Sequence, residues 1–187
     1  MVSFSTDEEQ INSIEFFSTF LEKNNHKIGK KIEGAIGFTL TLPNETQPTK
    51  IVICSISNLE QEYLGIKDVN CYIIFVDLEN EESKTQIKSI LEYAEKHCEI
   101  SKKIYVLGIY TQEKNDKKLR KVKKKDIINP LDDIDNLDYE YKELNLTNSN
   151  EMTEVVMEIL QNCSKELTSE QEYNDKEEKK SKSCCIY

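Results

Sequence analysis

The sequence lacks a run of apolar residues long enough to cross a bilayer, and its start, MVSFSTDEEQ, lacks the basic and then apolar pattern of a secretory signal. These two absences predict a cytosolic protein. Histidine is also scarce, because the chain has only His26 and His97, and neither stands at metal-site spacing from a cysteine. No zinc site is therefore expected.

Cysteine pairs of the C-x-x-C kind are absent as well, although the chain has 6 cysteines. Away from the C-terminus, each cysteine stands alone within an apolar pattern. This pattern predicts reduced thiols packed in the core, as is usual for cytosolic proteins. The cysteines concerned are Cys54, Cys71, Cys98 and Cys163.

An excess of positive charge is missing too, since the 187 residues carry a formal net charge of -10. This balance argues against a nucleic-acid-binding surface, and no nucleic-acid partner is predicted. The local exception is KKLRKVKKK, residues 117–125. Such a run could contact phosphates or an anionic membrane, but a solvated surface helix or loop is the favoured interpretation.

What the sequence does contain is an alternation of strand-like and helix-like segments. The apolar runs KIVICSI, NCYIIFVDL and KKIYVLGIY are rich in β-branched and aromatic residues, which predicts buried strands. Between the last two runs, residues 81–98 carry apolar side chains at helical spacing behind a start signal at Asn80 and Ser83. Further strands are predicted at 2–5, 37–42 and 140–146, and further helices at 11–23 and 151–163.

This alternation predicts an α/β fold with a mostly parallel sheet covered by helices on both faces. The linker PNETQP between the runs at 37–42 and 50–56 is typical of a hairpin, so one strand is expected to run antiparallel. Beyond Leu167 the composition becomes too polar to bury a core. We therefore expect one domain over residues 1–167 and a disordered tail over 168–187.

Four short segments carry a resemblance to a known family through their order and spacing. They are IGFTL (36–40), IIFVD (73–77), YVLG (105–108) and KELNLTNSN (142–150). With the order of predicted elements, they make nearly the whole chain resemble a small GTPase of the Ras superfamily, nearest the Rab branch. The resemblance implies a Ras-type three-layer fold. Its six-stranded sheet has the order 2-3-1-4-5-6, one antiparallel edge strand, and helices on both faces.

The family binds guanine nucleotide and magnesium through short motifs, and the resemblance places degenerate versions of them here. Where the family has G-x-x-x-x-G-K-S/T, this chain has TDEEQINS. Its first residues are Thr6 and Asp7, Asn12 replaces the lysine, and only Ser13 matches. Such a loop needs glycines that accept positive φ and a lysine on the terminal phosphates. Losing the lysine and adding close carboxylates could cost ~5 kcal/mol of binding free energy.

The resemblance places the other motifs at positions that have changed in the same way. The magnesium-linked D-x-x-G is replaced around Ser55 and Asn58, and the threonine of the first switch by Gly34 or Ala35. The positions that would read the guanine base are Ile109, Tyr110 and Gln112 in place of N-K-x-D, and Asn145, Leu146 and Thr147 in place of S-A-K. No carboxylate remains to accept hydrogen bonds from the base.

Loss of every phosphate, metal and base contact predicts a pseudo-GTPase that works as a protein-binding module in vesicle trafficking or signalling. No cofactor, no catalytic residue and no GTP hydrolysis are expected. Glu60 and Gln61, near the place of the family's glutamine, are interpreted as exposed polar residues. The alternative is a divergent, functional GTPase that binds GTP or GDP with magnesium at Ser13. A third possibility is an unrelated α/β domain whose terminal cysteines are accidental.

The chain ends in SKSCCIY, which fits C-a-a-X if Cys184 is the lipid acceptor. It also fits the paired-cysteine ending on which Rab-like proteins receive two geranylgeranyl chains, here at Cys184 and Cys185. Stable anchoring takes a second lipid or a basic patch, and Lys179, Lys180 and Lys182 supply the patch. The resemblance then implies an endomembrane location on the cytoplasmic face with a cytosolic pool. It implies a prenyltransferase, escort proteins, and effector or regulator proteins as partners.

Overall fold

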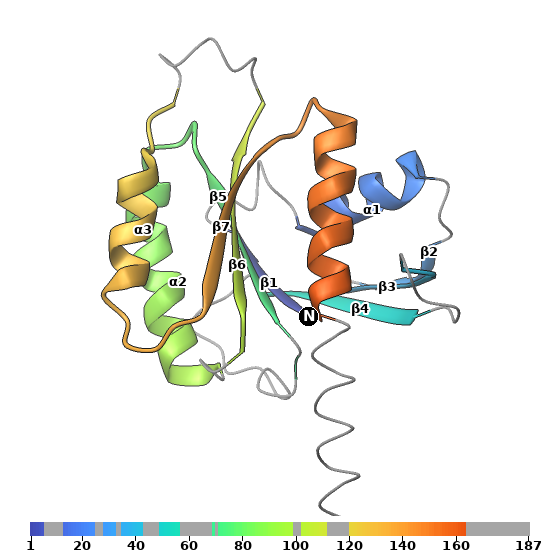
Figure 1. Cartoon of the computed structure of the whole chain (residues 1–187), viewed down its shortest axis with the longest axis horizontal. Coiled ribbons are helices and arrows are strands. Elements are labelled where there is room, and N and C mark those ends of the chain that lie inside the picture. The colour runs from blue at the N-terminus through green and yellow to red at the C-terminus, as the bar shows by residue number, and fades with distance from the viewer. Residues whose placement is uncertain are drawn as a thin grey trace, which may run out of the picture.

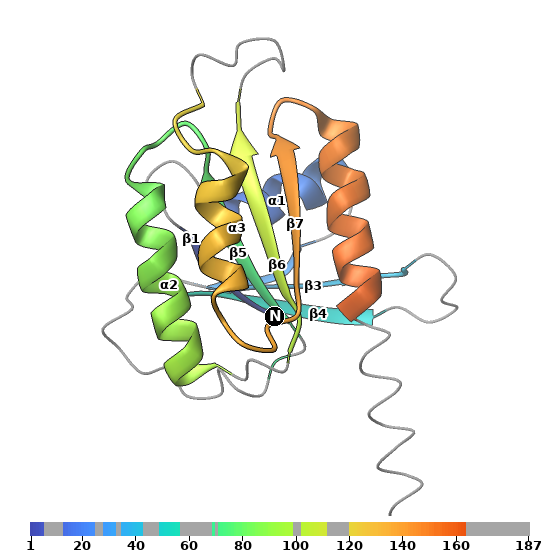
Figure 2. The ribbon, with the colours of Figure 1, turned by 60° about the vertical axis from the view of Figure 1, so that its left-hand side comes forward.

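The computed structural model describes residues 1–5, 13–24, 28–32, 35–42, 49–56, 69, 71–98, 102–111 and 120–163. In these ranges a seven-stranded sheet lies between two layers of helices, as Figure 1 and Figure 2 show from two sides. The strands are β1 (Val2–Ser5), β2 (Ile28–Ile32), β3 (Ala35–Leu40), β4 (Thr49–Ile56), β5 (Tyr72–Asp77), β6 (Ile104–Tyr110) and β7 (Tyr139–Asn145). The helices are α1 (Ser13–Lys23), α2 (Ser83–His97), α3 (Lys124–Asp132) and helix 149–163.

The strands follow the order β2-β3-β4-β1-β5-β6-β7 across the sheet. The pairs from β4 through β1, β5 and β6 to β7 are all parallel. Strand β3 is antiparallel to both of its neighbours, β2 and β4. The predicted α/β class, the mostly parallel sheet and the hairpin between β3 and β4 are therefore confirmed.

Two details of the predicted sheet were wrong. The described residues form seven strands rather than six, and the antiparallel strand β3 lies second from the edge rather than at the edge. The additional strand is β2, IGKKI, whose Lys30 and Lys31 interrupt the apolar pattern that marked the other strands. Lysine is common in edge strands because its charge discourages pairing with other chains. An edge position thus explains how so polar a segment pairs as a strand.

Helix α3 was also missed, because it begins within the basic run and contains Pro130. Its Ile127 and Leu131 stand four residues apart and are fully buried against the sheet. This spacing was the available signal. Within the basic run, Val122 is buried, whereas Lys123, Lys124 and Lys125 are exposed. The interpretation of these three lysines as solvated surface residues is confirmed.

The core is divided into two layers by the sheet. Strand β5 is buried along its whole length, and its side chains alternate between the two layers. Ile73 and Phe75 pack with α1 and helix 149–163, whereas Ile74 and Val76 pack with α2 and α3. Burial on both faces explains why this strand has a continuous apolar run. No helix in the described ranges is long and apolar enough to span a membrane.

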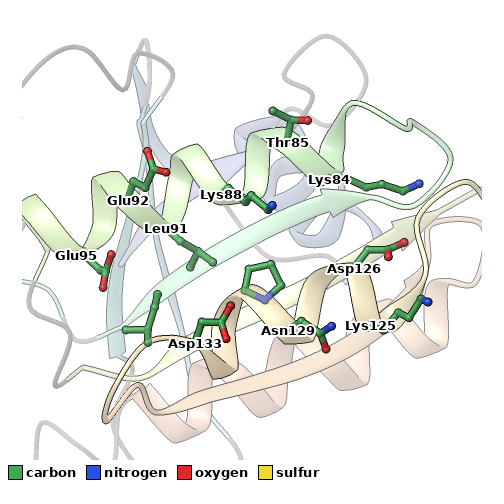
Figure 3. Close-up of a pocket in the computed structure, with 12 residues that line it drawn as sticks. Lys84, Thr85, Lys88, Leu91, Glu92, Glu95, Lys125, Asp126, Asn129 and Asp133 are labelled. Atoms are coloured by element: carbon green, nitrogen blue, oxygen red, sulfur yellow. The ribbon is translucent and has the colours of Figure 1, made fainter.

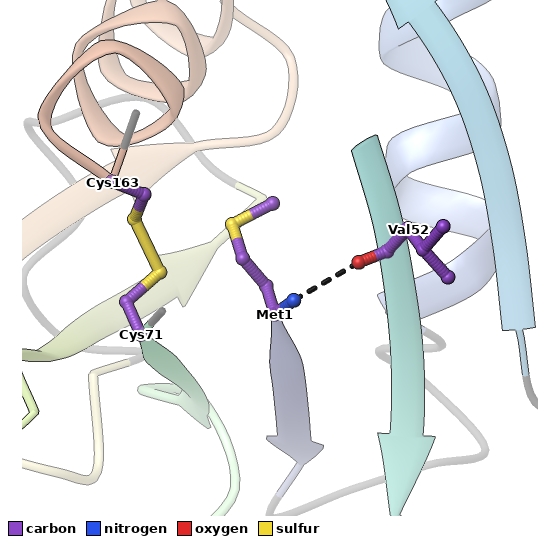
Figure 4. Close-up of a disulfide and its surroundings, with 4 residues drawn as sticks. All are labelled: Met1, Val52, Cys71 and Cys163. Carbon is purple, nitrogen blue, oxygen red and sulfur yellow. Dashed lines mark hydrogen bonds between the residues drawn. A yellow bond between two sulfur atoms is a disulfide. The ribbon is translucent and has the colours of Figure 1, made fainter. Parts of the chain in front are cut away.

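A disulfide joins Cys71, the residue before β5, to Cys163 at the end of helix 149–163 (Figure 4). Their Cα atoms are 6.2 Å apart, within the usual range for a disulfide. The prediction that these two cysteines are reduced was therefore wrong, although both are buried as expected. The prediction failed because the two residues are 92 positions apart in sequence, and only the fold brings them together. Cys54 and Cys98 are reduced thiols, as predicted.

Strand β1 is short, yet it occupies the middle of the sheet and pairs on both sides. Met1 extends this pairing, because its carbonyl accepts a hydrogen bond of 3.1 Å from the backbone N–H of Cys54. Its ammonium group donates to the carbonyl of Val52 at 3.0 Å, beside the disulfide (Figure 4). Burial lowers the pKa of this ammonium group below its usual value.

Candidate functional site

The candidate site is the edge of the sheet at which the parallel strands end. Strands β5, β6 and β7 finish side by side there, with Asp77 paired to Ile109 and Tyr110 paired to Asn145. In open α/β sheets, ligands bind outside the carboxyl ends of the strands. The same edge contains the positions at which the resemblance predicts a degenerate base site.

The Asp77 and Glu79 carboxylates at this edge accept hydrogen bonds from nearby residues of the chain. Asp77 is almost fully buried, and its Oδ1 accepts a hydrogen bond of 2.7 Å from the backbone N–H of Glu79. The carboxylate of Glu79 accepts hydrogen bonds from Thr111, at 3.3 Å from the backbone N–H and at 2.7 Å from the hydroxyl. Glu79 thereby links the residues after β5 to those after β6.

The base-site positions on β6 are filled by buried side chains. Ile109 and Tyr110 are 1% and 3% exposed, respectively. Ile109 packs in the layer of α1 and helix 149–163, and Tyr110 packs on the opposite face of the sheet. The guanidinium of Arg120 lies 4.2 Å from the centre of the Tyr110 ring, which is typical of a cation–π contact. In this arrangement Ile109 offers no polar side-chain group, and the Tyr110 ring is buried beneath the Arg120 guanidinium.

The corresponding positions after β7 form a turn that satisfies its own polar groups. Asn145 Oδ1 accepts hydrogen bonds from Thr147, at 3.0 Å from the backbone N–H and at 2.8 Å from the hydroxyl. Leu146 is partly buried against the core, and its N–H donates to the carbonyl of Tyr110 at 3.0 Å. The structure therefore brings the described positions of both predicted halves of the base site together, at the ends of neighbouring strands.

A charged network beside this edge was not predicted from the sequence. The Arg120 guanidinium forms an ion pair with Glu143, and the Tyr141 hydroxyl donates to the same carboxylate at 3.1 Å. Burial, followed by the nearby Glu143 charge, raises the pKa of Tyr141 well above its usual value. The network fixes β7 to the segment that precedes α3. No sequence signal connects Arg120 to Glu143, because their proximity depends on the crossover through α3.

Several predicted site residues lie outside the described residues. These are Thr6, Asp7, Asn12, Gln112, Asn58, Glu60, Gln61 and Gly34, together with Cys184 and Cys185 and the rest of the tail over 168–187. Ser13 is the first residue of α1, Ser55 belongs to β4, and Ala35 is the first residue of β3. No group of three or more histidine, cysteine, aspartate or glutamate residues in the described ranges is placed to hold a metal ion.

No protein-family model matches the chain, and no match is found among curated proteins.

Proposed function

We propose that this chain is a membrane-anchored, Rab-like member of the Ras superfamily that binds no guanine nucleotide and acts as a protein-binding module in vesicle trafficking or signalling. One support is the arrangement of the sheet. When β2 is set aside, the remaining strands, renumbered along the chain, read 2-3-1-4-5-6. This is the order that the resemblance implies. The antiparallel strand is the second in the chain in both cases.

The main support for the proposed absence of nucleotide binding is that the side chains at the base-site positions are buried or hydrogen-bonded within the chain. A guanine pocket needs polar groups that face an open space, and a buried apolar site without hydrogen-bonding partners does not favour a polar base. Here Ile109 and Tyr110 are buried, and Asn145 accepts hydrogen bonds from its own turn. A base would have to displace packed side chains and an existing turn before it could bind.

The phosphate side of the proposed site adds an electrostatic argument from the sequence. The segment TDEEQINS has three carboxylates and no lysine where a triphosphate would need positive charge. Carboxylates close to a triphosphate repel it, by about 1 kcal/mol per pair of unit charges at 4 Å in water and by more near a protein surface. GTP hydrolysis is not part of the proposed function, because the uncharged Asn12 stands in the place of the phosphate-binding lysine.

The nucleotide content of the purified protein tests this proposal directly. We expect no GTP or GDP to be released when the protein is denatured and the supernatant is separated by ion-exchange chromatography. We also expect no rise in melting temperature when GTP or GDP is added with magnesium, because a ligand that binds only the folded state would raise it. Release of bound guanine nucleotide would overturn the proposal in favour of a divergent, functional GTPase.

The proposed partners are the cytoplasmic face of an endomembrane, reached through prenyl groups at Cys184 and Cys185, and proteins that recognise the folded domain. Prenyltransferase and escort proteins would act on the tail before it reaches the membrane. The sequence supports this part of the proposal through two cysteines behind a lysine-rich segment. Two lipids, or one lipid with a basic patch, are what stable anchoring requires.

A further inference from the structure

A groove of about 710 Å³ runs between α2 and α3, on the face of the sheet opposite α1 and helix 149–163. Leu91 of α2 is buried in it, and Pro130 and Ile134 are half-buried along the other side. The two helices are held together by the buried apolar layer beneath, so their spacing belongs to the folded core. The groove therefore presents an apolar strip between two helices that pack on the same core layer.

Apart from Asp126, which lies among the lysines, the charges that line the groove are separated by sign along its length (Figure 3). Lys84 and Lys125 lie at the end where α2 and α3 begin, and Lys88 follows one turn later on α2. Glu92, Glu95 and Asp133 lie toward the opposite end. The sign of the charge on α2 changes within one helical turn, between Lys88 and Glu92. The groove therefore has a cationic end and an acidic end.

Most of these charges are not engaged by other described residues. Lys84 forms an ion pair with Glu81 at 3.2 Å, and Asp126, at the cationic end, accepts a hydrogen bond of 2.9 Å from the N–H of Lys123. By contrast, five exposed side chains of the groove form no ion pair with another described residue. They are Lys88, Lys125, Glu92, Glu95 and Asp133.

We propose that this groove binds a helical segment of a partner protein whose acidic side chains lie at one end, whose basic side chains lie at the other, and whose aliphatic side chains lie between them. Charge complementarity assigns the two ends, and Leu91 with Pro130 and Ile134 receives the aliphatic middle. Helices that lie in apolar grooves are a recurrent mode of peptide recognition. The proposal rests on the proposed function, in which the domain acts through protein contacts, and it names the surface and the chemistry of the partner.

The pattern of charge selects this occupant over an anionic one. A phosphate-rich surface, such as nucleic acid or an anionic membrane, would suit the cationic end but would be repelled by Glu92, Glu95 and Asp133. The length also fits a helix. From Lys84 to Glu95, α2 rises about 16 Å at 1.5 Å per residue, so a helical segment of about 12 residues spans the groove.

The first test uses synthetic peptides in place of the unidentified partner. A labelled, helix-stabilised peptide of about 12 residues carries glutamates at one end, leucines in the middle and lysines at the other end. The control peptide has the same composition, with glutamate and lysine alternating along its length. Fluorescence anisotropy at low salt should show the polarised peptide binding about tenfold more tightly than the control. Equal binding of the two peptides, or no binding of either, would overturn the proposal.

Variants of the groove then test which charges are used. Lys88→Glu with Lys125→Glu leaves both ends acidic, and it should weaken binding of the polarised peptide about tenfold. Adding Glu92→Lys and Glu95→Lys restores opposite ends in reversed order, so the same peptide should bind again after turning end for end. The matched control is Lys23→Glu with Lys96→Glu, which changes the net charge equally at exposed helix positions outside the groove. Loss of binding in this control, or no recovery in the reversed variant, would contradict the proposed mode.

The nucleotide and peptide experiments together distinguish failure of the groove proposal from failure of the proposed function. If the protein contains no nucleotide and binds both peptides equally, the groove proposal is wrong and the proposal of a nucleotide-free module is retained. If bound guanine nucleotide is released and the polarised peptide still binds as described, the module proposal falls and the groove stands.

Discussion

The packing around position 108 in β6 requires a glycine. A Cβ atom added to it would lie 2.7 Å from the hydroxyl oxygen of Tyr141 and 3.1 Å from two methyl carbons of Leu78. The first distance is shorter than real Cβ contacts allow. Because Tyr141 is tied to Glu143 and Leu78 is buried, neither neighbour is free to withdraw without cost.

We expect Gly108→Ala to lower the free energy of unfolding by about 1–3 kcal/mol, the usual cost of overpacking a core. Urea denaturation of the variant and the wild type measures the difference. Tyr141→Phe removes the nearer obstacle, so the double variant should lose less than the sum of the two single changes. Strict additivity would show that the Tyr141 hydroxyl is not what Gly108 accommodates.

A second residue-scale prediction concerns Tyr139, whose hydroxyl donates to the carboxylate of Asp132. This hydrogen bond raises the pKa of Tyr139 from 10.0 to about 12. The raised pKa means that the contribution to stability is present below pH 10.0 and is lost as the pH rises through about 12. Asp132→Asn should bring the pKa of Tyr139 back toward 10.0 in a tyrosinate absorbance titration.

The neighbouring change Asp133→Asn serves as the control for that titration. Asp133 is also exposed but makes no hydrogen bond to a tyrosine among the described contacts. It should leave the pKa of Tyr139 unchanged. A similar fall in both variants would assign the effect to the general charge of this end of α3.

At the scale of elements, helix 149–163 is joined to the sheet by a disulfide as well as by apolar packing. It follows the last strand of the sheet, and the Cys71–Cys163 disulfide fixes its far end to β5. The apolar face of the helix also packs on the sheet through Met152, Val156 and Ile159. The disulfide therefore adds to an existing interface and closes a loop of 92 residues.

Reduction of this disulfide should destabilise the domain by ~4 kcal/mol, because a cross-link that closes a long loop removes entropy from the unfolded chain. Urea denaturation with and without a thiol reductant measures the effect. The variant Cys71→Ala with Cys163→Ala is the control, and the reductant should not change its stability. An equal effect of the reductant on this variant would assign the change to another cause.

The disulfide also bears on the proposed location. The cytosol keeps thiols reduced, and persistent disulfides are typical of oxidising compartments. The Cys71–Cys163 disulfide is therefore an observation against the proposed cytoplasmic location, and the redox state of these two cysteines in the cell tests that location. Alkylation of free thiols in intact cells, followed by denaturation, measures whether Cys71 and Cys163 are reduced. A fully formed disulfide in the cell would count against the cytoplasmic location.

At the scale of the whole molecule, the proposed function divides the chain between a folded domain that contacts proteins and a tail that contacts a membrane. The change Cys184→Ser with Cys185→Ser should move the protein from the membrane fraction to the soluble fraction, because both proposed lipid acceptors are removed. Either single change should give partial release, since one lipid alone binds marginally. Fractionation of cells with quantitative blotting measures the distribution.

The control for this experiment keeps both cysteines and alters their neighbours. Ser181→Ala with Ser183→Ala leaves the C-C-I-Y ending intact and should not change the membrane fraction. Unchanged membrane binding after loss of both cysteines would mean that the anchor lies elsewhere in the chain.

The sequence by itself determined the fold class and most of the elements. The apolar runs of β4, β5 and β6 and the helical spacing of α2 are local patterns, and local patterns follow directly from burial on one or two faces. It also determined the apolar character of Ile109 and Tyr110, because residue type alone shows that an N-K-x-D motif is not present.

Only the tertiary structure decided which distant residues meet. The edge strand β2 forms through pairing with β3, and its own lysine-bearing sequence gives little sign of it. The Cys71–Cys163 disulfide, the Arg120–Glu143 ion pair and the charge-separated groove join residues from different elements. Such contacts depend on strand order and helix placement, which result from packing the whole core and are not encoded in any single stretch of the chain.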